Sequence, residues 1–204
     1  MADTHERSSV PPSASAQIIL VLRNLLAERY PEMGRHVNTV ARLCDTIAPE
    51  VGLPLDEREA LRQAAFLHDI GKLSLAESIL QKPQPLDERE WELMRLHPIV
   101  GERILLAAGL LGNVVEFVRS SHERVDGTGY PDGRAGDEIP LGARIIAACD
   151  AYDAMTSPRP YRPIPMTSGG ASLELIRGSD TQFDTDVVDV LCRALASDRS
   201  AIAA

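Results

Sequence analysis

Apolar residues recur at helical spacing over most of this chain. Steps of three and four residues separate apolar positions between Ile18 and Leu26, and again between His36 and Ile47. Acidic residues suited to a helix N-terminus open two further segments, at Asp56 and after Leu86. No convincing period-two alternation interrupts this pattern. It therefore predicts an all-α protein, with helices near residues 18–26, 36–47, 56–68, 86–100, 110–121 and 140–154, and weaker ones near 168–177 and 184–196.

Proline- and glycine-rich segments break the helical pattern at residues 82–85, 126–137 and 157–165. The first residues are rich in serine, proline and charge, which is typical of a segment without a packed core. A chain of 204 residues is long enough to bury a core of its own. We therefore predict one domain over residues 13–198 that opens with an N-terminal helix, between disordered tails at residues 1–12 and 199–204.

Charge and composition narrow the function classes. The chain carries 21 Lys and Arg against 30 Asp and Glu, a formal net charge of −9. This balance argues against a general nucleic-acid binder but permits a small anionic ligand held by a local cationic cluster or a metal. Cys44, Cys149 and Cys192 lack metal-ligand spacing and are expected as small buried hydrophobes. With no signal peptide or membrane span in the pattern, we expect a soluble, cytoplasmic protein without membrane or nucleic-acid partners.

Four of the five histidines lie in core-facing or glycine-rich surroundings, namely His36, His68, His97 and His122. His5, in the predicted tail, is expected to be inert. A single histidine on an apolar helical face is usually a hydrogen-bonded core residue, so none of the four is informative alone. Pro98 starts or kinks a helix at His97 and could present that imidazole to a cavity. Together the four favour a metal centre, because imidazoles suit Fe, Mn, Zn and similar ions.

Two aspartates can complete such a centre. Asp69 directly follows His68 at the predicted end of a helix, so both side chains can reach one point and Asp69 can bridge two ions. Asp150 closes an apolar run, where a buried carboxylate needs a metal or an arginine partner. The sequence thus predicts a metal site between core helices.

The segment His122–Pro131 packs a histidine, two carboxylates, two glycines and a Tyr-Pro pair into ten residues. Its imidazole and its carboxylates, Glu123 and Asp126, can bind metal, and the glycines let the backbone turn sharply around a bound group. Combined with the earlier segment His68–Lys72, it points to a metal-dependent hydrolase.

The order of these motifs resembles that of an HD-GYP domain, the branch of the HD metal-dependent phosphohydrolases that cleaves the bacterial second messenger cyclic di-GMP. The match runs from about His36 to Asp186. Its elements are His36, His68-Asp-Ile-Gly-Lys72, Leu96-His-Pro98, His122-Glu-Arg-Val-Asp-Gly-Thr-Gly-Tyr-Pro131, Ile139 to Ala147 leading to Asp150, Asp153-Ala-Met-Thr-Ser157, Arg159-Pro-Tyr-Arg162 and Gln182-Phe-Asp184.

The resemblance implies a role for each matching residue. One metal would be held by His36, His68, Asp69 and Asp150, and Asp69 would bridge to a second metal held by His97 and His122. Asp69 and Lys72 would be catalytic, with Lys72 near the scissile phosphate. The residues expected to contact substrate are Lys72, Arg159, Arg162, Gly129, Tyr130 and Pro131. Glu32 matches a ligand to a third metal in some members, although a solvated charge at a helix start is an equal alternative.

Two divalent ions, Fe or Mn, are the expected cofactors, because mixed imidazole and carboxylate ligands suit them; Zn, Co and Ni stay open. A hydroxide held between the metals would attack in line, and Lys72, Arg159 and Arg162 would offset the added negative charge. The resemblance thus implies hydrolysis of cyclic di-GMP to pGpG and/or GMP.

One departure and two rival functions accompany this interpretation. The family usually has two consecutive histidines where this chain has Ser121 and His122, and serine is a poor ligand, so we expect two metals and not a third.

The substrate could instead be cyclic GMP-AMP or linear pGpG. Alternatively, a non-catalytic domain could bind the messenger or a GGDEF-domain protein through Gly129–Pro131. We expect a monomer or weak dimer, in which the stripe Ile18–Leu26 packs on the domain.

Overall fold

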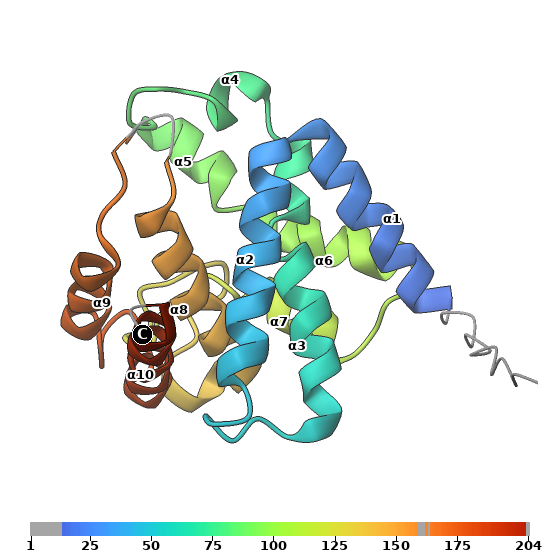
Figure 1. Cartoon of the computed structure of the whole chain (residues 1–204). Helices are drawn as coiled ribbons and strands as arrows, with labels where there is room; N and C mark the ends of the chain where they lie inside the picture. Colours follow the sequence, from blue (N-terminus) through green and yellow to red (C-terminus); the bar gives the residue numbers. More distant parts are fainter. Residues whose placement is uncertain (1–13, 159–161, 163, 203–204) are drawn as a thin grey trace, which may run out of the picture.

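The computed structural model describes residues 14–158, 162 and 164–202. Over this part of the chain the secondary structure is almost entirely helical (Figure 1), and the isolated bridges include Asp126 to Ala135 and Ser179 to Phe183. The all-α prediction is confirmed. The elements are α1 (Ala14–Arg29), α2 (Pro31–Ile47), α3 (Leu55–Leu67), the 3-10 helix η1 (Ile70–Ser74), α4 (Glu77–Leu80), α5 (Glu88–Met94), α6 (His97–Ala107), α7 (Asn113–Ser120), the 3-10 helix η2 (Gly136–Glu138), α8 (Leu141–Thr156), α9 (Ser168–Arg177) and α10 (Thr185–Ile202).

Helices α2 and α3 form the centre of the bundle. They pack against each other, with α1 on one side, α8 to α10 on the other, and α7 behind them (Figure 1). The apolar stripe predicted on α2 faces inward, since Val40 and Ile47 have no exposed surface and Leu43 is buried. Each such side chain contributes about 1.5–3 kcal/mol through burial, so the stripe fixes which face of α2 is turned inward. His36 lies on that same face.

The segment predicted as one element over residues 86–100 is two helices. Asp87 caps α5, because its carboxylate accepts the Glu90 backbone N–H at 2.9 Å while Glu90 accepts the Asp87 N–H at 2.8 Å. Helix α6 begins at His97, with Pro98 in its first turn. The proline lacks an N–H, which the first turn of a helix does not need, and it thereby sets the position of His97.

The structure describes the predicted tails of the domain only in part. Residues 1–12 lie outside the described residues, as do 203–204. Residues 199–202 belong to α10, which ends at Ile202, in place of the predicted tail. The stripe Ile18–Leu26 packs on the domain through Ile19 and Leu26, whereas Leu25 is half exposed.

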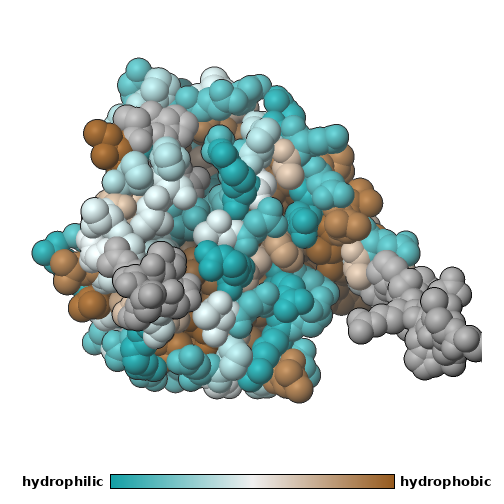
Figure 2. All heavy atoms as spheres, viewed as in Figure 1, coloured by the Kyte–Doolittle hydropathy of each residue, from teal (hydrophilic) through white to brown (hydrophobic). Residues whose placement is uncertain are grey.

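The surface view shows a largely hydrophilic face with separate apolar patches (Figure 2). Among the residues that the structure describes, no helix combines the length and the apolar character needed to span a bilayer. Cys44 and Cys149 are buried free thiols, as predicted, and Cys192 is partly exposed.

Candidate metal centre

Six predicted ligands come together from five parts of the fold. Helix α2 carries His36, and α8 carries Asp150. His68 and Asp69 follow the last residue of α3, and His97 is the first residue of α6. His122 lies two residues past the end of α7. The ligands therefore project from helix ends and from the facing sides of helices. The packing of these helices holds the ligands in place.

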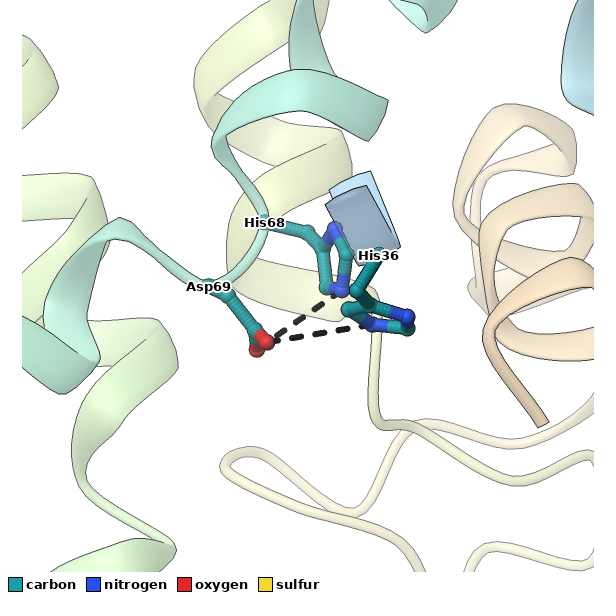
Figure 3. Close-up of side chains that lie close together, drawn as sticks. All are labelled: His36, His68 and Asp69. Carbon is teal, nitrogen blue, oxygen red and sulfur yellow. Dashed lines mark ion pairs between the residues drawn. The ribbon is translucent and has the colours of Figure 1, made fainter. Parts of the chain in front are cut away.

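The ligand atoms form two groups that share Asp69. His36, His68 and Asp69 lie within 4.8 Å of one another, and so do Asp69, His97 and His122. In the first group the Asp69 carboxylate is 3.6 Å from His68 Nε2 and 3.9 Å from His36 Nε2 (Figure 3). In the second, Asp69 Oδ1 is 3.6 Å from His97 Nε2. The carboxylate thus occupies the bridging position between two candidate sites.

Four buried polar atoms that face the cluster have no hydrogen-bond partner. They are His68 Nε2, His97 Nε2, His122 Nε2 and Asp69 Oδ1, which the Lys72 ammonium approaches at 2.6 Å without hydrogen-bond geometry. Leaving several buried donors or acceptors unpaired is costly, and native proteins rarely do so without a ligand. The donor set of imidazoles and carboxylates suits a divalent metal ion.

The other ring nitrogen of His68 and of His97 is anchored. His68 Nδ1 lies 2.9 Å from the Ala65 carbonyl oxygen, and His97 Nδ1 lies 2.7 Å from that of Met94. A carbonyl oxygen can only accept, so Nδ1 must carry the proton, and Nε2 presents its lone pair to the cluster. This is the tautomer that a metal ligand requires.

Asp153 is a functional residue that the sequence analysis quoted in a motif but gave no role. Its Oδ2 lies 2.5 Å from His36 Nδ1, on the side of the ring opposite Asp150, whose Oδ1 is 3.0 Å from His36 Nε2. Asp153 is buried and follows Asp150 by three residues on α8, so both carboxylates face α2. That spacing was the signal available in the sequence. Asp153 orients His36 in the way that outer carboxylates orient metal-binding histidines.

Electrostatics leave most of the cluster in the protonation states that metal ligands need. Burial lowers the pKa of His122 to about 4 and holds that of His97 well below its ordinary value. The pKa of Asp69 is lowered despite burial, because Lys72 and three histidines surround it. Burial also lowers the pKa of His36, but hydrogen bonds to Asp150 and Asp153 outweigh this and raise it to about 9. A divalent cation would compete with the His36 proton for the same nitrogen.

A close backbone contact brings the two halves of the cluster together. A Cβ on Gly71 would lie 1.9 Å from the His97 carbonyl oxygen and 2.7 Å from the Gly101 nitrogen. Only glycine permits this approach of η1 to the start of α6. Because Asp69 immediately precedes η1 and His97 opens α6, the contact sets the separation between these two ligands.

The remaining predicted site residues differ in whether they reach the cluster. Lys72 reaches the cluster through Asp69. Arg162 donates from its guanidinium to the Ala154 carbonyl on α8, and Arg159 lies outside the described residues. Glu32 is not brought to the cluster: its side chain is 81% exposed and forms an ion pair with Arg35.

The carboxylates of the glycine-rich segment build its loop and do not face the cluster. Glu123 is buried and accepts the backbone N–H groups of Asp132, at 2.7 Å, and Arg134, at 3.1 Å. Asp126 accepts from Arg124 and Thr128. Both were candidate metal-binding groups in the sequence, but in the structure they brace the loop, because its backbone N–H groups need acceptors.

The Gly129–Pro131 stretch lies against the cluster through Tyr130. The Tyr130 ring stacks on His122, with ring centroids 5.2 Å apart and an interplanar angle of 11°. A Cβ on Gly129 would lie 2.4 Å from the Arg124 nitrogen, so glycine is needed for this turn. Ser121 is buried and donates to the Val118 carbonyl at 3.0 Å.

Comparison with known proteins agrees with this geometry. A family model described as HD domain matches residues 20–187, most of the chain. The chain belongs to the HD-domain family. Its His122–Pro131 segment has the pattern of the HD-GYP branch, so the resemblance found in the sequence is confirmed.

Several relatives of this HD domain are longer proteins. A 3'3'-cGAMP-specific phosphodiesterase 2 of Vibrio cholerae is 35% identical over 179 residues, which cover 87% of this chain and 34% of that protein. A cyclic di-GMP phosphodiesterase of Thermotoga maritima is 38% identical, with coverage of 86% and 48%. The crystal structure of the cyclic GMP-AMP specific phosphodiesterase V-cGAP3 of V. cholerae superposes with a TM-score of 0.59 at 30% identity, covering 92% of this chain and 42% of that one. The chain thus spans a third to a half of these relatives.

Proposed function

We propose that this HD domain hydrolyses a phosphodiester bond of a cyclic dinucleotide, with cyclic di-GMP as substrate and pGpG and/or GMP as product. One observation carries the proposal: Asp69 is shared by two groups of buried ligand atoms, and among these atoms His68 Nε2, His97 Nε2 and His122 Nε2 have no hydrogen-bond partner. Two cations held by these groups would suit the in-line displacement at phosphorus that phosphodiesterases perform.

We propose two divalent ions, Fe or Mn, as the cofactors. His36, His68, Asp69 and Asp150 would hold the first, and Asp69, His97 and His122 would hold the second. Bound there, the ions would lower the pKa of a water molecule and stabilise charge on the phosphoryl oxygens. The mixture of imidazole and carboxylate donors supports Fe or Mn over soft-ligand metals.

Lys72 is the proposed catalytic cation of the protein itself. Its ammonium lies 2.6 Å from Asp69 Oδ1, and its side chain is 20% exposed, so it borders both the cluster and solvent. From that position it would offset the negative charge that develops on the phosphate and its leaving oxygen. Arg159 and Arg162 stay proposed phosphate contacts on the basis of the resemblance.

Cyclic GMP-AMP is the second candidate substrate, because V. cholerae relatives of this chain are named for it. Both candidates share a guanine nucleotide and a scissile phosphodiester. We place the reaction in the cytoplasm, which the buried free thiols Cys44 and Cys149 support, since a reducing compartment keeps such thiols unpaired.

Turnover by a metal-loaded sample tests the proposal. The protein is purified without oxygen, its metals are counted per chain, and cyclic di-GMP, cyclic GMP-AMP and pGpG are followed with Mn or Fe(II) added. We expect two metals and hydrolysis of cyclic di-GMP. Faster hydrolysis of cyclic GMP-AMP would favour the second candidate. If a metal-loaded sample hydrolyses none of the three nucleotides, the proposed phosphodiesterase activity is refuted and a binding or adaptor role is left.

A further inference from the structure

A second cavity lies beside the ligand cluster. Its volume is about 370 Å³, and it is lined by Trp91, Arg95, Arg124, Thr128, Gly129 and Tyr130. None of the proposed metal ligands lines it, and none of the roles assigned above involves Trp91 or Arg95. The cavity is therefore a feature that the metal chemistry does not explain.

This cavity neighbours a smaller one that borders the ligand cluster. Arg124 and Tyr130 also line a cavity of about 240 Å³ that reaches His122 and Asp150. Tyr130 connects the two most directly, since its ring stacks on His122. A ligand with one phosphate at the metal ligands can therefore extend a neighbouring group past Tyr130 into the larger cavity.

The lining of the larger cavity suits a nucleobase. Trp91 offers an aromatic surface and is 43% exposed. Arg95 follows one helical turn later, its backbone N–H bonded to the Trp91 carbonyl at 2.9 Å. Arg124 is neutralised by Asp126 at 2.7 Å, whereas Arg95 forms no ion pair within the described part of the chain. No carboxylate lines the cavity. Aromatic rings stack on any base, and an arginine fork matches the O6 and N7 acceptors of guanine.

We infer that this cavity binds a guanine base of the substrate, stacked on Trp91 with the Arg95 guanidinium at its O6/N7 edge. The inference rests on the proposed function, because it names the subsite that recognises one half of the dinucleotide. Trp91 and Arg95 are here specificity residues, and neither takes part in the bond cleavage.

Trp91 is the only tryptophan of the chain, so its fluorescence reports directly on this cavity. The full chain, loaded with Mn, is titrated with the bisphosphorothioate analogue of cyclic di-GMP, which resists hydrolysis, and binding is measured in parallel by calorimetry. We expect a saturable change in Trp91 emission with the same Kd as the calorimetric signal. Saturation by calorimetry without any change in emission would overturn the inference.

Substitutions then separate the stacking of the base on Trp91 from the recognition of its O6/N7 edge by Arg95. Trp91→Ala should weaken binding roughly 5- to 100-fold, the range measured for stacking of one base, and Trp91→Phe should restore most of it. Arg95→Ala should weaken binding of the guanine analogue by roughly 5- to 100-fold but leave that of the matching cyclic di-AMP analogue unchanged. Leu93→Ala is the matched control, since Leu93 is 48% exposed on the same helix and does not line the cavity.

The two proposals can fail separately. Wild-type affinity in a folded Trp91→Ala variant, verified by circular dichroism, overturns the base site even if the enzyme turns over cyclic di-GMP. Conversely, the wild-type chain could hydrolyse no nucleotide and yet bind the guanine analogue with a change in Trp91 emission. That result would refute the proposed function and support the base site.

Discussion

Replacing Gly71 by alanine should remove one of the two metals. The added methyl would lie 1.9 Å from the His97 carbonyl oxygen and 2.7 Å from the Gly101 nitrogen, and both are backbone atoms that cannot rotate away. Ordinary contact begins at 3.4 Å. The 3-10 helix η1 and the start of α6 must therefore separate by about 1.5 Å, because close-packed interiors have no free volume to absorb the methyl.

The magnitude follows from this displacement. Overpacking of this kind costs roughly 1–3 kcal/mol of the free energy of unfolding, which lowers the Tm by roughly 2–12 °C in a chain of this size. Asp69 and His97 lie on opposite sides of the contact, with 3.6 Å between Oδ1 and Nε2. Metal–ligand bonds tolerate only about 0.2 Å. The position formed by Asp69, His97 and His122 should be lost, while the one that includes His36 and His68 is retained.

Metal content per chain after dialysis, together with thermal unfolding, measures both effects. Wild type should hold two metals and Gly71→Ala one, with a lower Tm. Gly170→Ala is the control, since a Cβ at that position in α9 meets only side-chain atoms, the nearest at 3.2 Å, and should leave the metal content at two. Two retained metals with an unchanged Tm in Gly71→Ala would show that the η1–α6 contact does not set the ligand spacing.

Three further substitutions test the cluster itself. Asp69→Ala should remove both metals and all turnover, because Asp69 belongs to both ligand groups, and turnover that persists would mean that the site is misassigned. Lys72→Ala should keep the metals but slow hydrolysis, so an unchanged rate would contradict its catalytic role. Asp153→Asn should weaken metal binding at His36 roughly 10- to 100-fold in a chelator competition, whereas Asp137→Asn, on a 99% exposed side chain, should not.

The helices and most of the cluster could be predicted from sequence because each depends on local chemistry. Three-and-four spacing predicts which helix face is buried and placed His36 on the inward face of α2, whereas Asp150 was singled out because it follows an apolar run. Pro98 predicted either a helix start or a kink at His97, and the structure shows a helix start. The adjacency of His68 and Asp69 sufficed to bring both to one point. In each case the neighbours of the residue in the sequence determine the direction in which its side chain points.

Features that depend on contacts between distant segments were not predicted. Glu123 accepts two backbone N–H groups about ten residues further along, a partnership that only the folded loop creates. Trp91 and Tyr130 share a cavity although the sequence gives no sign of their proximity. Glu32 lies one turn before His36 on α2, yet its side chain is 81% exposed, because it belongs to the first turn of the helix and pairs with Arg35.

The number of metal positions is the point at which this chain departs from its family's pattern. Ser121 stands where a second histidine is usual, and its hydroxyl donates to the Val118 carbonyl. Glu32, the other residue matched to a third metal, points to solvent. His122 meanwhile has its ring stacked on Tyr130 and belongs to the group that contains His97. We therefore predict two metal positions, because Ser121 and Glu32 are both engaged outside the two ligand groups that share Asp69.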